Sequence, residues 1–153
     1  MKKNLVILGV IVAVILIVFG WWTRDFWWQK YQANKILREF AALDWAYKND
    51  PYGSTTPEGT LALFIEALKK GDAELASNYF VPEKKDEYKK AFENWIKLGK
   101  VEKIISEISK TGGTGKFNNS VYQMSSVGMS NVVSLVVNFR KNEQTKKWLI
   151  ESL

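Results

Sequence analysis

The sequence contains no cysteine and no histidine. Without cysteine there is no thiol nucleophile, no disulfide and no residue that a lipoprotein acyl chain could modify. Without histidine there is no imidazole base, no Ser-His triad and no zinc site of the usual ligand types. We therefore expect a protein that is not an enzyme, with no catalytic residue, no metal and no cofactor.

Clustered charge of one sign is also missing. The formal net charge is +6, but lysines alternate with acidic residues through much of the chain, for example in residues 84–93. Such alternation is typical of a solvated helix face with ion pairs three or four residues apart. A nucleic-acid-binding surface needs a concentrated basic patch, so we expect no nucleic acid among the partners.

One segment has no charged residue at all. Residues 5–22 read LVILGVIVAVILIVFGWW, and as a helix they would extend roughly 27 Å, close to the ~30 Å hydrocarbon core of a bilayer. A lone strand would leave its backbone groups unpaired in lipid, so the run predicts a transmembrane helix. Trp21 and Trp22 stand where a signal peptidase requires small residues, which predicts a retained anchor.

The charges around this run predict its orientation. Lys2 and Lys3 precede it, whereas Arg24 and Asp25 follow it and cancel. Positive charge stays in the cytoplasm. We expect a single-pass protein of the cell membrane, with residues 1–4 as a cytoplasmic tail and the C-terminal part extracytoplasmic.

Aromatic residues are concentrated just after the run. At about 100° per residue their rings surround the helix instead of forming one stripe, which favours anchoring in the headgroup zone over a partner-binding face. The predicted membrane-interface residues, with the lipid bilayer as partner, are Trp21, Trp22, Phe26, Trp27, Trp28 and Tyr31.

Residues 23–48 continue as an amphipathic helix, because apolar residues recur at steps of three and four. The stripe packs on the chain's own domain, which we favour, or mediates self-association, since Phe26, Ala33, Phe40 and Tyr47 follow one another at intervals of seven residues. In either case it is a possible partner face, made of Ala33, Ile36, Leu37, Phe40, Leu43 and Tyr47. Turn-rich residues 49–56 are predicted to be a linker.

Residues 57–153 are predicted to form one α+β domain, because helical periodicity comes first and period-two alternation follows. Thr56 and Pro57 open one helix, Asp72 caps a second that reaches Phe80, and residues 83–98 and 101–110 form two more. Strands are expected at residues 117–126, 132–139 and 146–153, and the Gly-rich residues 111–116 are expected to be a flexible connection. This fold class is three or four helices on a curved antiparallel sheet of three or more strands.

Part of this domain resembles a known superfamily. Residues 56–61 (TPEGTL), 64–72 (FIEALKKGD) and 76–80 (ASNYF), together with the closing KWLIESL, are similar to nuclear transport factor 2-like domains. The resemblance implies a cone-shaped α+β fold, in a short bacterial version attached to a membrane anchor. The superfamily includes enzymes, adaptors and secretion scaffolds, so the resemblance implies fold more than function.

Enzymes of that superfamily use an acid, often with Tyr or His, that projects inward from the sheet. Candidate residues for such a pocket here are Tyr122, Asn138 and Arg140, and Glu151 is a further polar strand residue. None pairs with a second titratable group at a recognisable spacing. We therefore predict a non-catalytic binding or scaffolding protein of the cell envelope. The alternatives are a scaffold subunit of a secretion-type machine and a small-molecule binder or enzyme that uses the cone interior.

Overall fold

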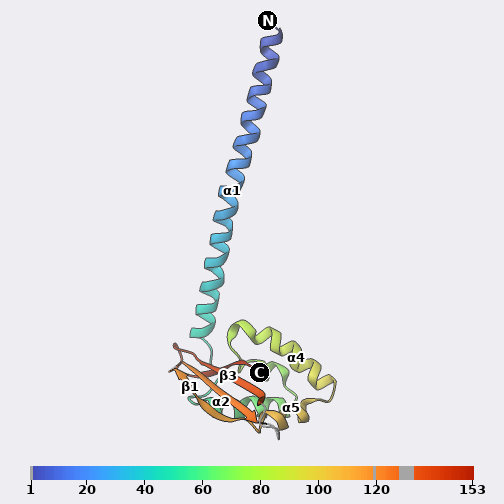
Figure 1. The fold of residues 1–153 in the computed structure, drawn as a ribbon, viewed down its shortest axis with the longest axis vertical. Coiled ribbons are helices and arrows are strands. Elements are labelled where there is room, and N and C mark those ends of the chain that lie inside the picture. Colours follow the sequence, from blue (N-terminus) through green and yellow to red (C-terminus); the bar gives the residue numbers. More distant parts are fainter. Residues whose placement is uncertain (1, 119, 128–132) are drawn as a thin grey trace. The chain divides into compact units, whose positions relative to one another are not determined.

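The computed structural model describes residues 2–118, 120–127 and 133–153, without the side chains of residues 2–8, 10, 22–23, 25–27, 113–118, 127 and 133–134. The chain divides into two compact units, Met1–Ala42 and Leu43–Leu153. Figure 1 labels most of the elements. In chain order they are α1 (Lys2–Lys48), α2 (Pro57–Lys69), α3 (Ala73–Ser77), the 3-10 helix η1 (Pro82–Lys84), α4 (Lys85–Lys97), α5 (Val101–Ile108), β1 (Gly112–Asn118), β2 (Val121–Val127), β3 (Val133–Lys141) and β4 (Trp148–Ser152).

The first unit consists of most of α1. This helix is uninterrupted to Lys48 and ends where the sequence Asn49-Asp50-Pro51 predicted a stop. Within the described part of the chain, no helix combines the length and mean hydropathy that a membrane crossing requires. Six residues of the predicted span, residues 5–8, 10 and 22, have side chains outside that part.

The second unit begins with helices whose ends follow from local sequence. The Thr56 hydroxyl accepts the Gly59 amide at 3.1 Å, and Pro57 occupies the first helical position of α2. Asp72 caps α3 by accepting the Leu75 amide at 2.8 Å. Both predicted N-caps are confirmed. Each side chain satisfies an amide that has no partner within the helix.

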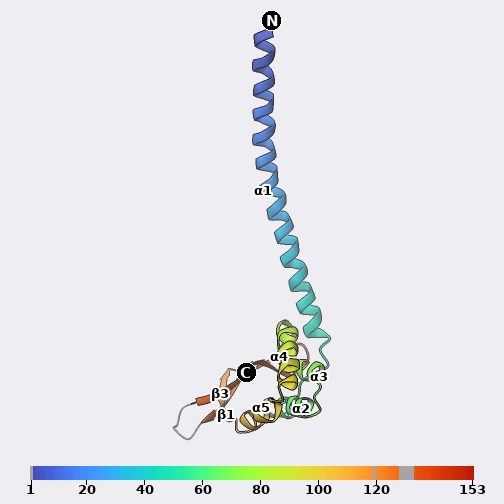
Figure 2. The same cartoon turned by 90° about the vertical axis from the view of Figure 1, so that its right-hand side faces the viewer.

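The strands form one antiparallel sheet in the order β1-β2-β3-β4. Helices α2, α4 and α5 lie to one side of this sheet (Figure 2), which confirms the α+β class. Three aromatic rings form the centre of the core between the helices, with centroids of Phe64, Phe80 and Phe92 within 5.5 Å of one another. Val137 and Phe139 of β3 are buried in the same core.

Two local predictions are wrong. Residues 117–126 are not one strand: β1 ends at Asn118 and β2 begins at Val121. The Gly-rich residues 112–115 are not a flexible connection but the first half of β1, which pairs with β2 through register shifts. Glycine has low strand propensity, but pairing with a neighbour and a local bulge overrides that preference at a sheet edge.

The second predicted helix is also shorter than expected, because its last residues pair with the sheet. The Ile150 amide donates to the Tyr79 carbonyl and the Val81 amide donates to the Ile150 carbonyl, both at 2.9 Å. At the same edge the Trp148 amide donates to the Ser54 carbonyl at 2.7 Å. The free edge of β4 is therefore covered by residues far away in sequence.

Residues 49–56, the predicted linker, belong to the second compact unit. Asp50 is buried, accepts the Tyr52 amide at 3.0 Å and forms an ion pair with Lys85 at 2.9 Å. Thr60 fixes the segment from the other side: its hydroxyl accepts the Ser54 amide at 2.9 Å and donates to the Trp148 carbonyl at 2.8 Å. This segment is thus an integral part of the domain.

Candidate functional site

Four polar side chains converge where the last turn of α1 meets the sheet. The Tyr47 hydroxyl donates to Glu83 Oε2 at 2.7 Å. Arg140 Nη1 donates to Glu83 Oε1 at 2.9 Å and to the Tyr47 hydroxyl at 3.3 Å, while Nη2 donates to Glu151. We call these four residues the Arg140 cluster. It joins α1, η1, β3 and β4.

The electrostatics of this cluster follow from its contacts. Burial, and then the hydrogen bond to the Glu83 carboxylate, raise the pKa of the Tyr47 hydroxyl well above its ordinary value. Burial acts to raise the pKa of Glu83, but the hydrogen bonds from Tyr47 and Arg140 outweigh it and leave that pKa lowered. Tyr47 therefore stays a neutral donor and Glu83 an ionised acceptor near neutral pH.

Two further contacts hold the same turn of α1. The Asn142 side-chain amide donates to the Tyr47 carbonyl at 2.8 Å, and Gln144 Nε2 of the side chain donates to the Asp44 carboxylate at 3.1 Å. Asn142 is buried, and its side-chain oxygen also accepts the Gln144 amide at 2.9 Å. The β3–β4 loop thus caps the Tyr47 carbonyl at the C-terminal end of the helix and also binds the Asp44 side chain.

The three predicted pocket residues do not share one face of the sheet. Tyr122 pairs with Phe139, so it points to the helix-covered face, whereas Asn138 and Arg140 point to the opposite face. Asn138 lies in a polar row across the strands: it accepts from Gln123 at 2.9 Å and donates to Ser152 at 2.8 Å. Arg140 is in ion pairs with Glu83 and Glu151.

Tyr122 lies beside Glu58, an acidic residue in the first turn of α2. Burial, and then a hydrogen bond to the Glu58 carboxylate, raise the pKa of the Tyr122 hydroxyl. The Tyr122 ring also packs edge-on against Trp148, with the centroids 6.2 Å apart. Tyr122 is therefore a fixed hydrogen-bond donor near the start of α2.

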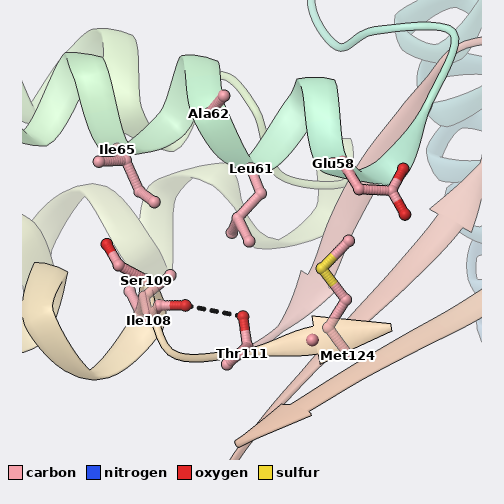
Figure 3. A pocket seen from close by; sticks show the side chains of 9 residues that line it. Glu58, Leu61, Ala62, Ile65, Ile108, Ser109, Thr111 and Met124 are labelled. Carbon is pink, nitrogen blue, oxygen red and sulfur yellow. Dashed lines mark hydrogen bonds between the residues drawn. The ribbon is translucent and has the colours of Figure 1, made fainter. Parts of the chain in front are cut away.

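Glu58 is at one end of a pocket of about 340 Å³ between α2, α5 and the sheet. In Figure 3, Leu61 and Ile65 of α2 face Ile108 and Met124 across this pocket. The Thr111 hydroxyl donates to the Ile108 carbonyl at 2.7 Å. The walls are mostly apolar, and the polar side chains of the lining are the Glu58 carboxylate and the hydroxyls of Ser109 and Thr111.

A second pocket, of about 520 Å³, lies between α4, α5 and the ends of β3 and β4. Its apolar walls are Tyr88, Trp95, Ile104, Leu135 and Leu153. Its charged lining residues are Lys100, Lys103 and Glu107. We call it the α4–α5 pocket. No sequence pattern had marked these residues as a site, because Tyr88, Trp95 and Ile104 fit equally well as core positions of amphipathic helices.

The predicted residues of α1 fall into two groups. Trp21, Trp28 and Tyr31 are exposed, whereas the side chains of Trp22, Phe26 and Trp27 lie outside the described part. Of the possible partner face, Ala33, Ile36, Leu37 and Phe40 are exposed, and Leu43 and Tyr47 are half-buried in the second unit. The structure thus buries only the last turn of that face.

Among the described residues, no three acidic side chains are grouped as metal ligands. Comparisons with known proteins found no matching family model, no similar curated protein and no similar solved structure.

Proposed function

We propose that this chain is a membrane-anchored, non-catalytic binding or scaffolding protein of the bacterial cell envelope, with residues 43–153 on the extracytoplasmic side. The observation that carries the proposal is the exposure of α1. Every large apolar side chain described between Ile11 and Trp21 is at least 50 % exposed. A continuous apolar surface of this kind requires an apolar surrounding, and the uncharged run of residues 5–22 is long enough for a bilayer.

The α1 aromatic residues support the same placement. Trp28 and Tyr31 stack with their ring centroids 6.1 Å apart, and the Arg24 guanidinium lies 5.3 Å from the Trp21 ring centroid. Exposed aromatic rings beside a cation are characteristic of the headgroup zone, where ring and charge find partners.

The scaffolding role is supported by how α1 ends. Its last turn is fastened to the domain by the Arg140 cluster and by Asn142. The partner face from Ala33 to Phe40 is exposed in the single chain. We infer that a protein partner or a second copy of this chain covers that face, next to the membrane.

The absence of catalysis in this proposal rests on the chemistry of the polar groups. Arg140 and Glu151, two titratable residues of the strands, form an ion pair with each other. Tyr47 and Glu83, the other members of the Arg140 cluster, are joined by a hydrogen bond. Tyr122 and Glu58 likewise form a hydrogen bond with each other.

We also propose that residues 57–153 are a nuclear transport factor 2-like cone. The helix-then-sheet order and the antiparallel sheet support this.

The cysteine-free sequence makes topology directly testable. Single variants Asn4→Cys and Ser106→Cys would be treated in intact cells with a membrane-impermeant maleimide. We expect Ser106→Cys, on the exposed side of α5, to be labelled at once and Asn4→Cys only after permeabilisation. Recovery of the chain in the soluble fraction, or the reverse labelling pattern, would contradict the anchor or its orientation.

The partner face needs a separate experiment. A photoreactive amino acid at Leu37 or Phe40 would crosslink the partner in cells, with Arg38, on another side of the helix, as the matched control position. A crosslinked product at the first two positions, identified by mass spectrometry as this chain or another protein, supports the proposal. Equal crosslinking from all three positions, or none, removes the reason to call the protein a scaffold.

A further inference from the structure

The α4–α5 pocket has no part in the function proposed above. Its volume of about 520 Å³ is within the ~300–1,000 Å³ of small-molecule sites. Five of its lining residues present carbon-rich side chains, and they come from α4, α5, β3 and the residue that follows β4, Leu153. A pocket of this composition favours a ligand that is mainly hydrocarbon.

The walls are held in place by the core. The Tyr88 ring lies 3.9 Å from the Phe80 ring centroid, and the Trp95 ring lies 5.1 Å from that of Phe92. Phe80 and Phe92 are fully buried. In addition, the Leu153 amide donates to the Tyr88 hydroxyl at 3.2 Å. These contacts fix both aromatic side chains before any ligand arrives, which lowers the entropy cost of binding.

The charged residues of the pocket leave a positive balance. Glu107 forms an ion pair with Lys110 at 2.9 Å. Lys100 and Lys103 are exposed, and within the described residues no carboxylate forms an ion pair with either of them. Two cations beside a hydrocarbon surface complement a molecule with an apolar chain and an anionic end.

We propose that the α4–α5 pocket binds a single-chain amphiphile with an anionic head group. The hydrocarbon chain occupies the space between Trp95, Ile104 and Leu135, and Lys100 and Lys103 hold the carboxylate or phosphate at the opening. This inference is independent of the proposed scaffolding role, because it depends only on residues of the second unit.

The test uses the full chain in phosphatidylcholine nanodiscs. The probe is dodecanoic acid carrying a diazirine at its methyl end, and the crosslinked residues are located by mass spectrometry. We expect labelling on α4, α5 and β3 next to the pocket. The charge-reversing pair Lys100→Glu and Lys103→Glu should lower this labelling about tenfold, equivalent to about 1.4 kcal/mol.

Two further variants distinguish binding of the head group and chain in the pocket from a general effect of the charge change. The pair Lys90→Glu and Lys97→Glu makes the same change of charge on α4 outside the pocket, and it should leave labelling unchanged. Ile104→Trp fills the apolar part and should lower labelling with all lysines present. If both lysine pairs behave alike, or Ile104→Trp has no effect, the inference is overturned.

Other probes distinguish the source of the anion. A diazirine lysophosphatidylglycerol that labels the pocket in place of dodecanoate would identify a phospholipid-derived ligand, and the reverse result would identify a free fatty acid. Both outcomes support an anionic amphiphile. Equal labelling of the pocket by diazirine dodecanol, which has no charge, would overturn it, as would labelling confined to α1.

Discussion

The Tyr47 hydroxyl donates to Glu83 Oε2 at 2.7 Å, across 36 residues of sequence. Through this bond, the last turn of α1 is attached to the element that leads into α4. Arg140 completes the connection by donating to both residues. The junction therefore depends on side-chain hydrogen bonds and not on backbone pairing, which makes it accessible to conservative substitutions.

Tyr47→Phe removes one hydroxyl and leaves the ring. We expect the free energy of unfolding of the second unit to fall by up to about 1 kcal/mol, because a hydrogen bond from the half-buried Tyr47 to an exposed carboxylate is lost. Native-state hydrogen exchange of β3 and β4 in the full chain would measure it. Tyr31→Phe, on the exposed part of α1, is the control and should change nothing. An unchanged exchange rate in Tyr47→Phe would show that the hydroxyl has no stabilising role.

The same bond predicts a loss of stability in alkali. Burial and Glu83 raise the pKa of Tyr47 above its unfolded value of about 10. Its contribution is therefore complete below pH 10 and is lost as the pH rises further. We expect stability to begin to fall above about pH 10 in the wild type and to continue falling as the pH rises, and to fall less in Tyr47→Phe. Parallel curves for the two proteins would assign the loss to other groups.

Glu83 predicts a loss of stability in acid. Its pKa is lowered in the folded chain, because the hydrogen bonds from Tyr47 and Arg140 outweigh the effect of burial. Its contribution is present above the unfolded pKa of about 4.3 and is lost as the pH falls below it. Glu83→Gln should be less stable than wild type at pH 7, with the difference shrinking toward pH 3. A constant difference would contradict this reading.

Lys85→Met tests the buried ion pair. The Asp50 side chain is 1 % exposed and Lys85 lies over the Tyr52 ring, 5.3 Å from its centroid. Removing the cation leaves a buried carboxylate without its partner, which costs about 3–5 kcal/mol. Chemical denaturation should show this loss, whereas Lys89→Met, in an exposed pair with Glu74, should cost less than about 1 kcal/mol. Similar losses in both variants would contradict the importance of burial.

A matched pair of glycines tests residues 49–56. Gly53 and Gly71 both have positive φ, of 86° and 69°. A Cβ at Gly53 would lie 2.3 Å from the Trp148 carbonyl oxygen, whereas one at Gly71 meets nothing within 4 Å. Gly71→Ala should therefore cost about 1 kcal/mol, from backbone strain alone. Gly53→Ala should lower the free energy of unfolding clearly more in the same denaturation experiment. Equal losses in the two variants would mean that residues 49–56 can move to accommodate the added Cβ at little cost.

The local sequence was enough to predict where α2 and α3 begin. Thr56, Pro57 and Asp72 act within three residues of their own position, so their roles could be predicted without knowing the rest of the fold. The Gly-rich half of β1 could not, because its strand conformation comes from pairing with β2 and not from its own preference.

The sites were harder to predict, because they join distant residues. Tyr47 and Arg140 are 93 residues apart, and the sequence placed them in two separate groups, a partner face and a pocket. The α4–α5 pocket draws on α4, α5, β3 and the C-terminal Leu153. Helical periodicity shows that Trp95 and Ile104 face inward, but not that the space in front of them stays open.

The pairing of β4 with Ser54 and with Tyr79–Val81 has a consequence for biosynthesis. This strand is translated after every element that it touches, so the ribosome must deliver residues 148–152 before the domain can close. Until then α2 lacks the part of its packing surface that β4 supplies, and the backbone groups of Tyr79 and Val81 lack their partner Ile150. An unfolded, late-closing polypeptide is the form that a translocation channel can thread.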